Sequence, residues 1–161
     1  MIVLVSDTSI LIDLERGGLL EAAFSCGMTL VVPDLLYDRE LADENGPYLK
    51  SLGLGVVSLS PAEVALAQEV SQARKGLSLP DCFALSCATR PDHVLVTGDR
   101  LLKKEASSRL GVAFGLLWLL DHMHESGHVP PANLIDGLTR IAQHPRARLP
   151  ADEVKRRLTS W

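Results

Sequence analysis

Short apolar runs alternate along the chain with longer stretches in which apolar residues recur at helical spacing. The short runs are rich in β-branched residues and favour strands at Ile2–Val5, Thr29–Val32, Gly55–Leu59 and Val94–Thr97, with a weaker fifth at Val112–Phe114. Between them the pattern predicts helices at Ser9–Leu14, Leu19–Phe24, Asp34–Ala42, Ala62–Lys75, Pro80–Thr89 and Arg100–Ser107. Strands that alternate with helices predict an α/β fold with a mostly parallel sheet flanked by helices.

The last third of the chain contains only helical patterns, at Leu116–His124, Ala132–Ala142 and Ala151–Leu158. We expect one domain over residues 1–161, with a sheet-and-helix core over about residues 1–120 and a helical extension over about 121–161. A chain of 161 residues, 47% of them hydrophobic, can bury one sizeable core. The apolar stretch Gly115–Leu120 is expected to be a core helix or, alternatively, a dimer surface.

Composition limits the classes of function. The net charge of −4 argues against a protein held to nucleic acid by a broad basic face, but clustered acids in an enzyme site would also lower the total. An odd cysteine count without framework spacing suits a reducing cytosol. The longest apolar run is far below the ~20 residues that cross a bilayer. We therefore expect a cytoplasmic protein without a membrane partner.

Four acidic residues fall where strands give way to helices. Asp7 follows the first predicted strand and Asp99 follows the fourth, so neighbouring parallel strands would bring both carboxylates to one crevice. Asp81 opens a predicted helix that would point out of the same sheet edge. Glu40 lies on the helix after the second strand, on the same face as Leu36.

Carboxylates that converge in one cleft repel one another and need a cation. Ligands that are all oxygen favour a hard ion, Mg²⁺ or Mn²⁺. Such an ion activates water and stabilises a leaving oxygen, so the chemistry indicated is hydrolysis of a phosphodiester. Each acid alone has a structural alternative: Asp7 as a helix cap, Asp81 as a partner of the helix dipole, and Asp99 as a turn residue.

At these residues the chain resembles the PIN-domain nucleases. The segment SDTSILIDL is similar to their opening strand and its Asp, LSLPDCFALSCA to the helix that carries their third acid, and VLVTGDRLLKKEA to their strand–Thr–x–Asp segment. The resemblance covers about residues 2 to 120, and the C-terminal tail is similar to an extension of some prokaryotic members. Its specificity lies in the ordered set, since each motif alone is weak.

The resemblance implies a three-layer fold with a five-stranded parallel sheet, and cleavage of RNA with Mg²⁺ or Mn²⁺. It makes Asp7, Glu40, Asp81 and Asp99 the metal ligands and catalytic acids, with Ser9 and Thr97 supporting them through hydrogen bonds. Many small prokaryotic members are VapC-type toxins, each inhibited by a co-encoded antitoxin, and members often form homodimers. The partners implied are RNA, an antitoxin protein and a second copy of the chain.

Two departures from the family pattern affect the site. The second acid of the family often lies six residues after a proline like Pro33, where this chain has Arg39. Glu40 is the nearest Glu in a Glu-Leu context, and Asp38 competes with it. Many members also carry an acid or Asn shortly after the last Asp, where Arg100-Leu101-Leu102 stands here, so the number of metal ions stays open.

Two groups of basic residues have a functional and a structural interpretation. Arg100, Lys103 and Lys104 flank the Asp99 segment and are candidates for RNA phosphate contacts, or they are ordinary solvated helix surface. The C-terminal region is basic as well and would meet RNA or an acidic antitoxin, but we expect a solvated face there; its basic residues are Arg146, Arg148, Lys155, Arg156 and Arg157.

The favoured hypothesis is a Mg²⁺- or Mn²⁺-dependent endoribonuclease that serves as the toxin of a toxin–antitoxin pair. One alternative is a catalytically silent protein-interaction module on the same fold. Another is a different Mg²⁺-dependent phosphate hydrolase. Dehalogenase-like phosphatases need a second Asp two residues after the first, where Ser9 stands.

Overall fold

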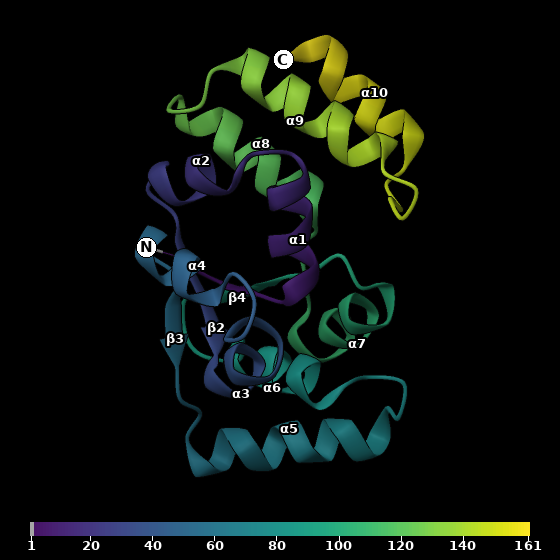
Figure 1. Cartoon of the computed structure of the whole chain (residues 1–161). Coiled ribbons are helices and arrows are strands. Elements are labelled where there is room, and N and C mark those ends of the chain that lie inside the picture. Colours follow the sequence, from purple (N-terminus) through teal and green to yellow (C-terminus); the bar gives the residue numbers. More distant parts are fainter. Residues whose placement is uncertain (1) are drawn as a thin grey trace.

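A parallel sheet organises the computed structural model, which describes residues 2–161 (Figure 1). Its strands are β1 (Val3–Ser6), β2 (Thr29–Pro33), β3 (Gly55–Val57) and β4 (His93–Val96), in the order β3-β2-β1-β4. Strand β1 is central and pairs with β2 from Val3↔Thr29 and with β4 through Ser6↔Val96. The first and last strands of the sheet therefore lie side by side, which brings the residues after both strands to one sheet edge.

The expected fifth strand is reduced to one bridge, which corrects the five-stranded prediction for residues 2–161. Phe114 bridges Val96, with its N–H 2.9 Å from Leu95 O and its carbonyl 2.9 Å from Thr97 N. Gly111 ends the preceding helix in the left-handed conformation and Gly115 caps the following one. The short connection between these two helices leaves no room for a longer strand.

Within residues 2–161, ten α-helices and one π-helical turn surround the sheet. All of them lie where the sequence predicts helices, except α4. The sequence of α4, GPYLKSL, is too short for its hydrophobic periodicity to be recognised. No helix in this part of the chain has the length and the apolar composition that spanning a membrane demands. The helices are α1 (Thr8–Arg16), α2 (Leu20–Ser25), α3 (Asp34–Leu36), α4 (Gly46–Leu52), α5 (Pro61–Ala73), α6 (Leu79–Cys87), α7 (Arg100–Leu110), α8 (Leu116–Ser126), α9 (Pro131–Gln143) and α10 (Ala151–Ser160), with the π turn η1 at Tyr37–Leu41.

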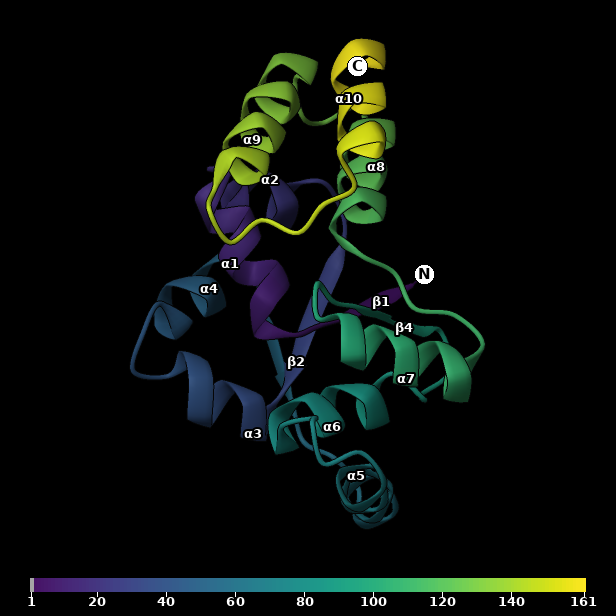
Figure 2. The same ribbon diagram turned by 90° about the vertical axis from the view of Figure 1, so that its right-hand side faces the viewer.

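The helices form layers on both sides of the sheet (Figures 1 and 2). Helix α6 packs against β1, β2 and β4, with α5 outside it and α3 and α7 beside it. Helices α1, α2 and α8 lie on the opposite side, and α9 and α10 are outermost there. Leu116, Leu117, Leu119 and Leu120 of α8 are buried, which confirms the core interpretation of that apolar stretch over the dimer surface.

The predicted helix over Asp34–Ala42 changes its winding part-way. Three α-helical residues are followed by the π turn η1, in which Ala42 N donates to Tyr37 O at 2.8 Å. A π turn accommodates one more residue than an α turn, and such turns often occur at functional sites. Glu40 lies in this turn, so its position on the helix differs from that expected from continuous α-helical spacing.

Helix α9 of the C-terminal extension contacts α1 of the core through two glycines. A Cβ atom on Gly137 would lie 2.6 Å from Leu19 Cδ1 and 2.9 Å from Gly17 O, and a Cβ on Gly17 would lie 2.8 Å from Ile141 Cδ1. Since real Cβ atoms do not approach so closely, the backbones meet here only because both residues lack a side chain. Leu134, Leu138 and Ile141 of α9 belong to the same buried cluster as the sheet residues.

The substitution Gly137→Ala should lower the free energy of unfolding by about 1–2 kcal/mol, because overpacking costs more than the roughly 1 kcal/mol that alanine adds to helix stability. Urea unfolding followed by circular dichroism measures the difference. Asn133→Ala, at an exposed position of the same helix, is the control and should leave stability equal or higher. A Gly137→Ala protein as stable as the wild type would contradict the close α1–α9 contact.

Candidate active site

The Asp7 carboxylate is the buried centre of the candidate site. It follows β1 directly and caps α1, and its side chain is only 2% exposed. Its Oδ1 atom accepts hydrogen bonds from Ile10 N at 3.2 Å and from Ser9 Oγ at 2.7 Å, and its Oδ2 atom accepts one from Thr97 Oγ1. Burial raises the pKa of Asp7, the three donors oppose that rise, and the charge of Asp99 adds to it.

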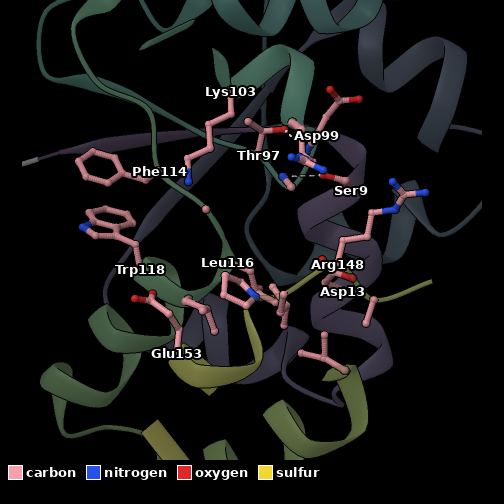
Figure 3. A pocket seen from close by; sticks show the side chains of 18 of the residues that line it. Ser9, Asp13, Thr97, Asp99, Lys103, Phe114, Leu116, Trp118, Arg148 and Glu153 are labelled. Atoms are coloured by element: carbon pink, nitrogen blue, oxygen red, sulfur yellow. Dashed lines mark hydrogen bonds between the residues drawn. The ribbon is translucent and has the colours of Figure 1, made fainter. Parts of the chain in front are cut away.

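Ser9 and Thr97 connect the two strand–helix junctions. Thr97 Oγ1 donates to Asp7 and accepts from Asp99 N at 3.0 Å. Ser9 Oγ donates to Asp7 and accepts from Gly98 N at 2.9 Å. The two hydroxyls thus join residues about 90 positions apart in the chain, which is the supporting arrangement predicted for them, and Figure 3 shows Ser9, Thr97 and Asp99 grouped at one end of a groove.

Only one of the two carboxylate oxygens of Asp99 is used in a hydrogen bond within the described residues. Its Oδ1 atom caps α7 by accepting from Leu102 N at 2.9 Å. Its Oδ2 atom accepts no hydrogen bond from residues 2–161, and the residue is exposed. The cap interpretation holds for Asp7, and Asp99, whose structural alternative was a turn residue, is a helix cap as well. In each carboxylate the second oxygen takes no part in the cap. Capping and site chemistry are not exclusive here.

Asp81 and Glu40 interact electrostatically with this pair. Asp81 lies in the first turn of α6, where its N–H donates to the cap residue Ser78 at 3.2 Å. Burial raises the pKa of Asp81 to about 6, with further contributions from the charges of Asp7, Asp99 and Glu40. The charges of the other three predicted acids thus all act on the carboxyl group of Asp81.

The structure separates Glu40 from its competitor Asp38. Glu40 is half-buried, and its Oε1 atom accepts a hydrogen bond from Thr8 Oγ1, next to Asp7 in the chain. Asp38 is exposed and does not contribute to the raised pKa of Asp81. Thr8 was not among the predicted site residues, and the signal for it is its place in the polar SDTS run between β1 and α1.

The donor set fits a hard cation, because the four acids offer only carboxylate oxygens and repel one another. Within residues 2–161, no three His, Cys, Asp or Glu side chains are grouped closely enough to hold one metal ion by themselves. Magnesium usually keeps several waters and is bound through one or two carboxylates, so direct ligation by three is not required for it.

The predicted phosphate-binding residues line the groove that opens beside Asp99. Arg100, Lys103 and Lys104 all belong to it, together with Ser9 and Thr97. Asp13 of α1 lies in the same groove, and burial raises its pKa against the opposing charges of Arg16 and His144. Sequence analysis gave no role to Asp13, because one acid on a helix has no distinguishing pattern.

In metal-free protein the Asp81 carboxyl should titrate near pH 6. Its pKa in the folded state lies above the ordinary value of 3.8, so the folded state loses stability as pH rises from about 4 through 6. Asp7→Asn removes a neighbouring negative charge and should lower the pKa of Asp81. Carbon-detected NMR of the side-chain carboxyls measures both values.

Glu63 is the internal control for this titration, because Arg90 holds its pKa at about 2 far from the site. Asp7→Asn should leave Glu63 unchanged. An Asp81 carboxyl that titrates near 4 in both proteins would contradict the electrostatic grouping of the acids.

Comparison with known proteins agrees with the fold. A family model described as a PIN domain matches residues 3–161, which include both the sheet and the C-terminal helices. No curated protein and no solved structure gives a match. PIN domains are generally nucleases and typically use divalent metal ions. Because the match covers nearly the whole chain, this protein belongs to the PIN-domain family.

Proposed function

We propose that this protein is a metal-dependent endoribonuclease that hydrolyses phosphodiester bonds in RNA. The observation that carries the proposal is the linkage of Asp7 and Asp99 through Thr97 at the ends of adjacent parallel strands. Asp81 lies in the electrostatic field of both. A nuclease fold with acids grouped at this edge is the combination that phosphodiester hydrolysis requires.

Asp7, Glu40, Asp81 and Asp99 would hold Mg²⁺ or Mn²⁺ in this proposal. When bound, such an ion acts as a Lewis acid towards the phosphate and lowers the pKa of a water ligand. The burial cost of the Asp7 charge and the mutual repulsion of the acids both favour cation binding over the metal-free state.

The roles of the protein groups follow from their contacts. Thr97 and Ser9 hold the Asp7 carboxylate by its two oxygens, so its orientation is set before substrate arrives. Thr97 also accepts a hydrogen bond from the backbone N–H of Asp99, a residue that lines the groove. Thr8 orients Glu40 through its hydroxyl.

The π turn offers a physical reason for the displaced second acid. Glu40 lies seven residues after Pro33, where the family often has its acid at six. The turn η1 contains one residue more than an α turn, which can compensate for the extra residue between Pro33 and Glu40. We therefore assign the second acid to Glu40 and not to Asp38.

Asp7→Asn should reduce cleavage of a mixed single-stranded RNA pool in Mn²⁺ by about 100-fold or more, as loss of one transition-state-stabilising group does. Glu40→Gln should also lose activity, whereas Asp38→Asn, the exposed control two residues away, should keep it. Chelator should abolish cleavage by the wild type. Equal cleavage by Asp7→Asn and wild type would refute the mechanism.

Thermal melting separates metal binding from catalysis in the same proteins. Mn²⁺ at 100 times its dissociation constant should stabilise the wild type by about 2.7 kcal/mol and should have little effect on Asp7→Asn. Without metal, Asp7→Asn should melt at an equal or higher temperature, because a buried charge has been removed. Lower stability of Asp7→Asn without metal would count against clustered acids.

We further propose that the biological role is that of a toxin in the cytoplasm, with an antitoxin protein as partner, on the basis of the resemblance to VapC-type toxins. Induced expression of the wild type in a bacterial host should then arrest growth, and Asp7→Asn at equal protein level should not. Normal growth with an active enzyme would indicate an RNA-processing nuclease in place of a toxin.

A further inference from the structure

A groove of about 1180 Å³ runs from Asp99, the member of the four acids that lines it, to the C-terminal extension (Figure 3). Residues of α1 and α7 line it near Asp99, and residues of α8 and of the 144–150 loop between α9 and α10 line its other end. Figure 3 shows Lys103 extending towards Phe114, and Asp13 and Arg148 also line the groove. Core and extension thus contribute opposite walls of one groove.

The charge of the groove is opposite to that of the chain. Seven of its lining residues are cationic and three are carboxylates, although the chain as a whole carries −4. Such a local excess of positive charge attracts a polyanion. The cations are Arg16, Arg100, Lys103, Lys104, Arg146, Arg148 and Arg157, and the carboxylates are Asp13, Asp99 and Glu153.

Most of these cations have no acidic partner. Arg16 Nη1 lies 3.8 Å from Asp13 Oδ1, and Arg157 forms a bidentate ion pair with the carboxylate of Asp121. The other five form no ion pair with any of residues 2–161, and all five are exposed. Exposed cations that line one groove without acidic partners are available to contact phosphate groups. These five are Arg100, Lys103, Lys104, Arg146 and Arg148.

The 144–150 loop directs its two arginines outward. Ala147 N donates to His144 O at 2.9 Å and Arg146 N donates to His144 Nδ1 at 3.1 Å, which closes a turn. Leu149 packs on the hydrophobic core and Ala147 is half-buried, while the alternating residues Arg146 and Arg148 are exposed. The anchored loop therefore holds both guanidinium groups on the groove side.

The basic C-terminal residues divide into two groups in the structure. Arg146, Arg148 and Arg157 line the groove, whereas Lys155 and Arg156 on α10 do not. Arg146, Arg148, Lys155 and Arg156 are all exposed, so the two groups differ in their place relative to the groove and not in their exposure. This division provides a charge-matched control within the extension.

An aromatic pair in the groove favours a strand with unpaired bases. Phe114 and Trp118 stack with ring centroids 4.1 Å apart, and both are half-buried lining residues. Aromatic side chains beside a cationic groove are typical of sites that bind single strands, because every base presents a face for stacking. A duplex would keep its bases stacked inside itself.

We infer that single-stranded RNA occupies this groove, with Arg146 and Arg148 of the extension binding phosphates opposite Arg100, Lys103 and Lys104 of α7. The inference rests on the proposed ribonuclease function and extends it to the path of the substrate. The C-terminal extension is then part of the substrate-binding surface and not only a stabilising layer over α1.

The test compares two double variants that change charge equally. Fluorescence anisotropy with a labelled mixed-sequence 15-nucleotide RNA, in chelator so that nothing is cleaved, measures the dissociation constant. Arg146→Glu/Arg148→Glu should weaken binding at least tenfold and reduce the slope of log Kd against log salt by about 1.4, the value for two lost single-strand phosphate contacts. Lys155→Glu/Arg156→Glu should change affinity less than twofold.

The outcomes distinguish this inference from the proposed function. Equal affinities of the two double variants would overturn the groove assignment, whatever the wild type cleaves. If cleavage requires Asp7 but the RNA affinity does not depend on Arg146 and Arg148, the proposed ribonuclease function is supported and the groove assignment is wrong. Tighter binding of a duplex or of single-stranded DNA would refute single-stranded RNA as the occupant. Melting curves confirm that both variants are folded.

Tryptophan fluorescence gives a second readout at the aromatic wall. The chain has two tryptophans, and Trp161 stacks on His124 outside the groove. In Trp161→Phe the signal comes from Trp118 and should be quenched by the RNA. In Trp118→Phe the signal comes from Trp161 and should not change. Quenching of Trp161 alone would place the RNA elsewhere and overturn the inference.

Discussion

The burial of one carboxylate, Asp7, is the constraint on which the rest of the site depends. An acid that is 2% exposed needs hydrogen-bond donors, and here three donors come from two distant parts of the chain. Ile10 and Ser9 are local, but Thr97 reaches Asp7 only because β4 pairs with β1 in parallel register. Satisfying the buried charge and assembling the site are therefore the same requirement on the fold.

The groups that begin helices also form the site. Asp7 caps α1 and Asp99 caps α7 through Oδ1, while Oδ2 of Asp7 accepts from Thr97 and Oδ2 of Asp99 accepts no hydrogen bond from residues 2–161. The ionised form of Asp81 is unfavourable in the folded protein, since burial and like charges raise its pKa to about 6. A fold that keeps these acids together without a cation gives up stability, which is typical of functional sites.

The fold places acidic residues and unpaired basic residues in adjoining regions of the molecule. The acids gather where parallel strands end, while unpaired cations of α7 and of the 144–150 loop face one groove beside them. The glycine contact between α1 and α9 holds the extension against the core. In the proposed function, a phosphate chain attracted by the groove would meet Asp99, so the proposed binding surface adjoins the proposed reaction site.

The sequence alone determined the α/β class, the order of strands and helices, and the strand–helix junctions that carry Asp7 and Asp99, because hydrophobic periodicity and capping are local properties. It did not distinguish Glu40 from Asp38, reveal α4, or separate Arg148 from Arg156. Those differences were decided by the tertiary structure, through a π turn, a loop anchored by Leu149, and contacts between residues far apart in the chain. The weak fifth strand also became a single bridge, because two flanking glycines limit its length.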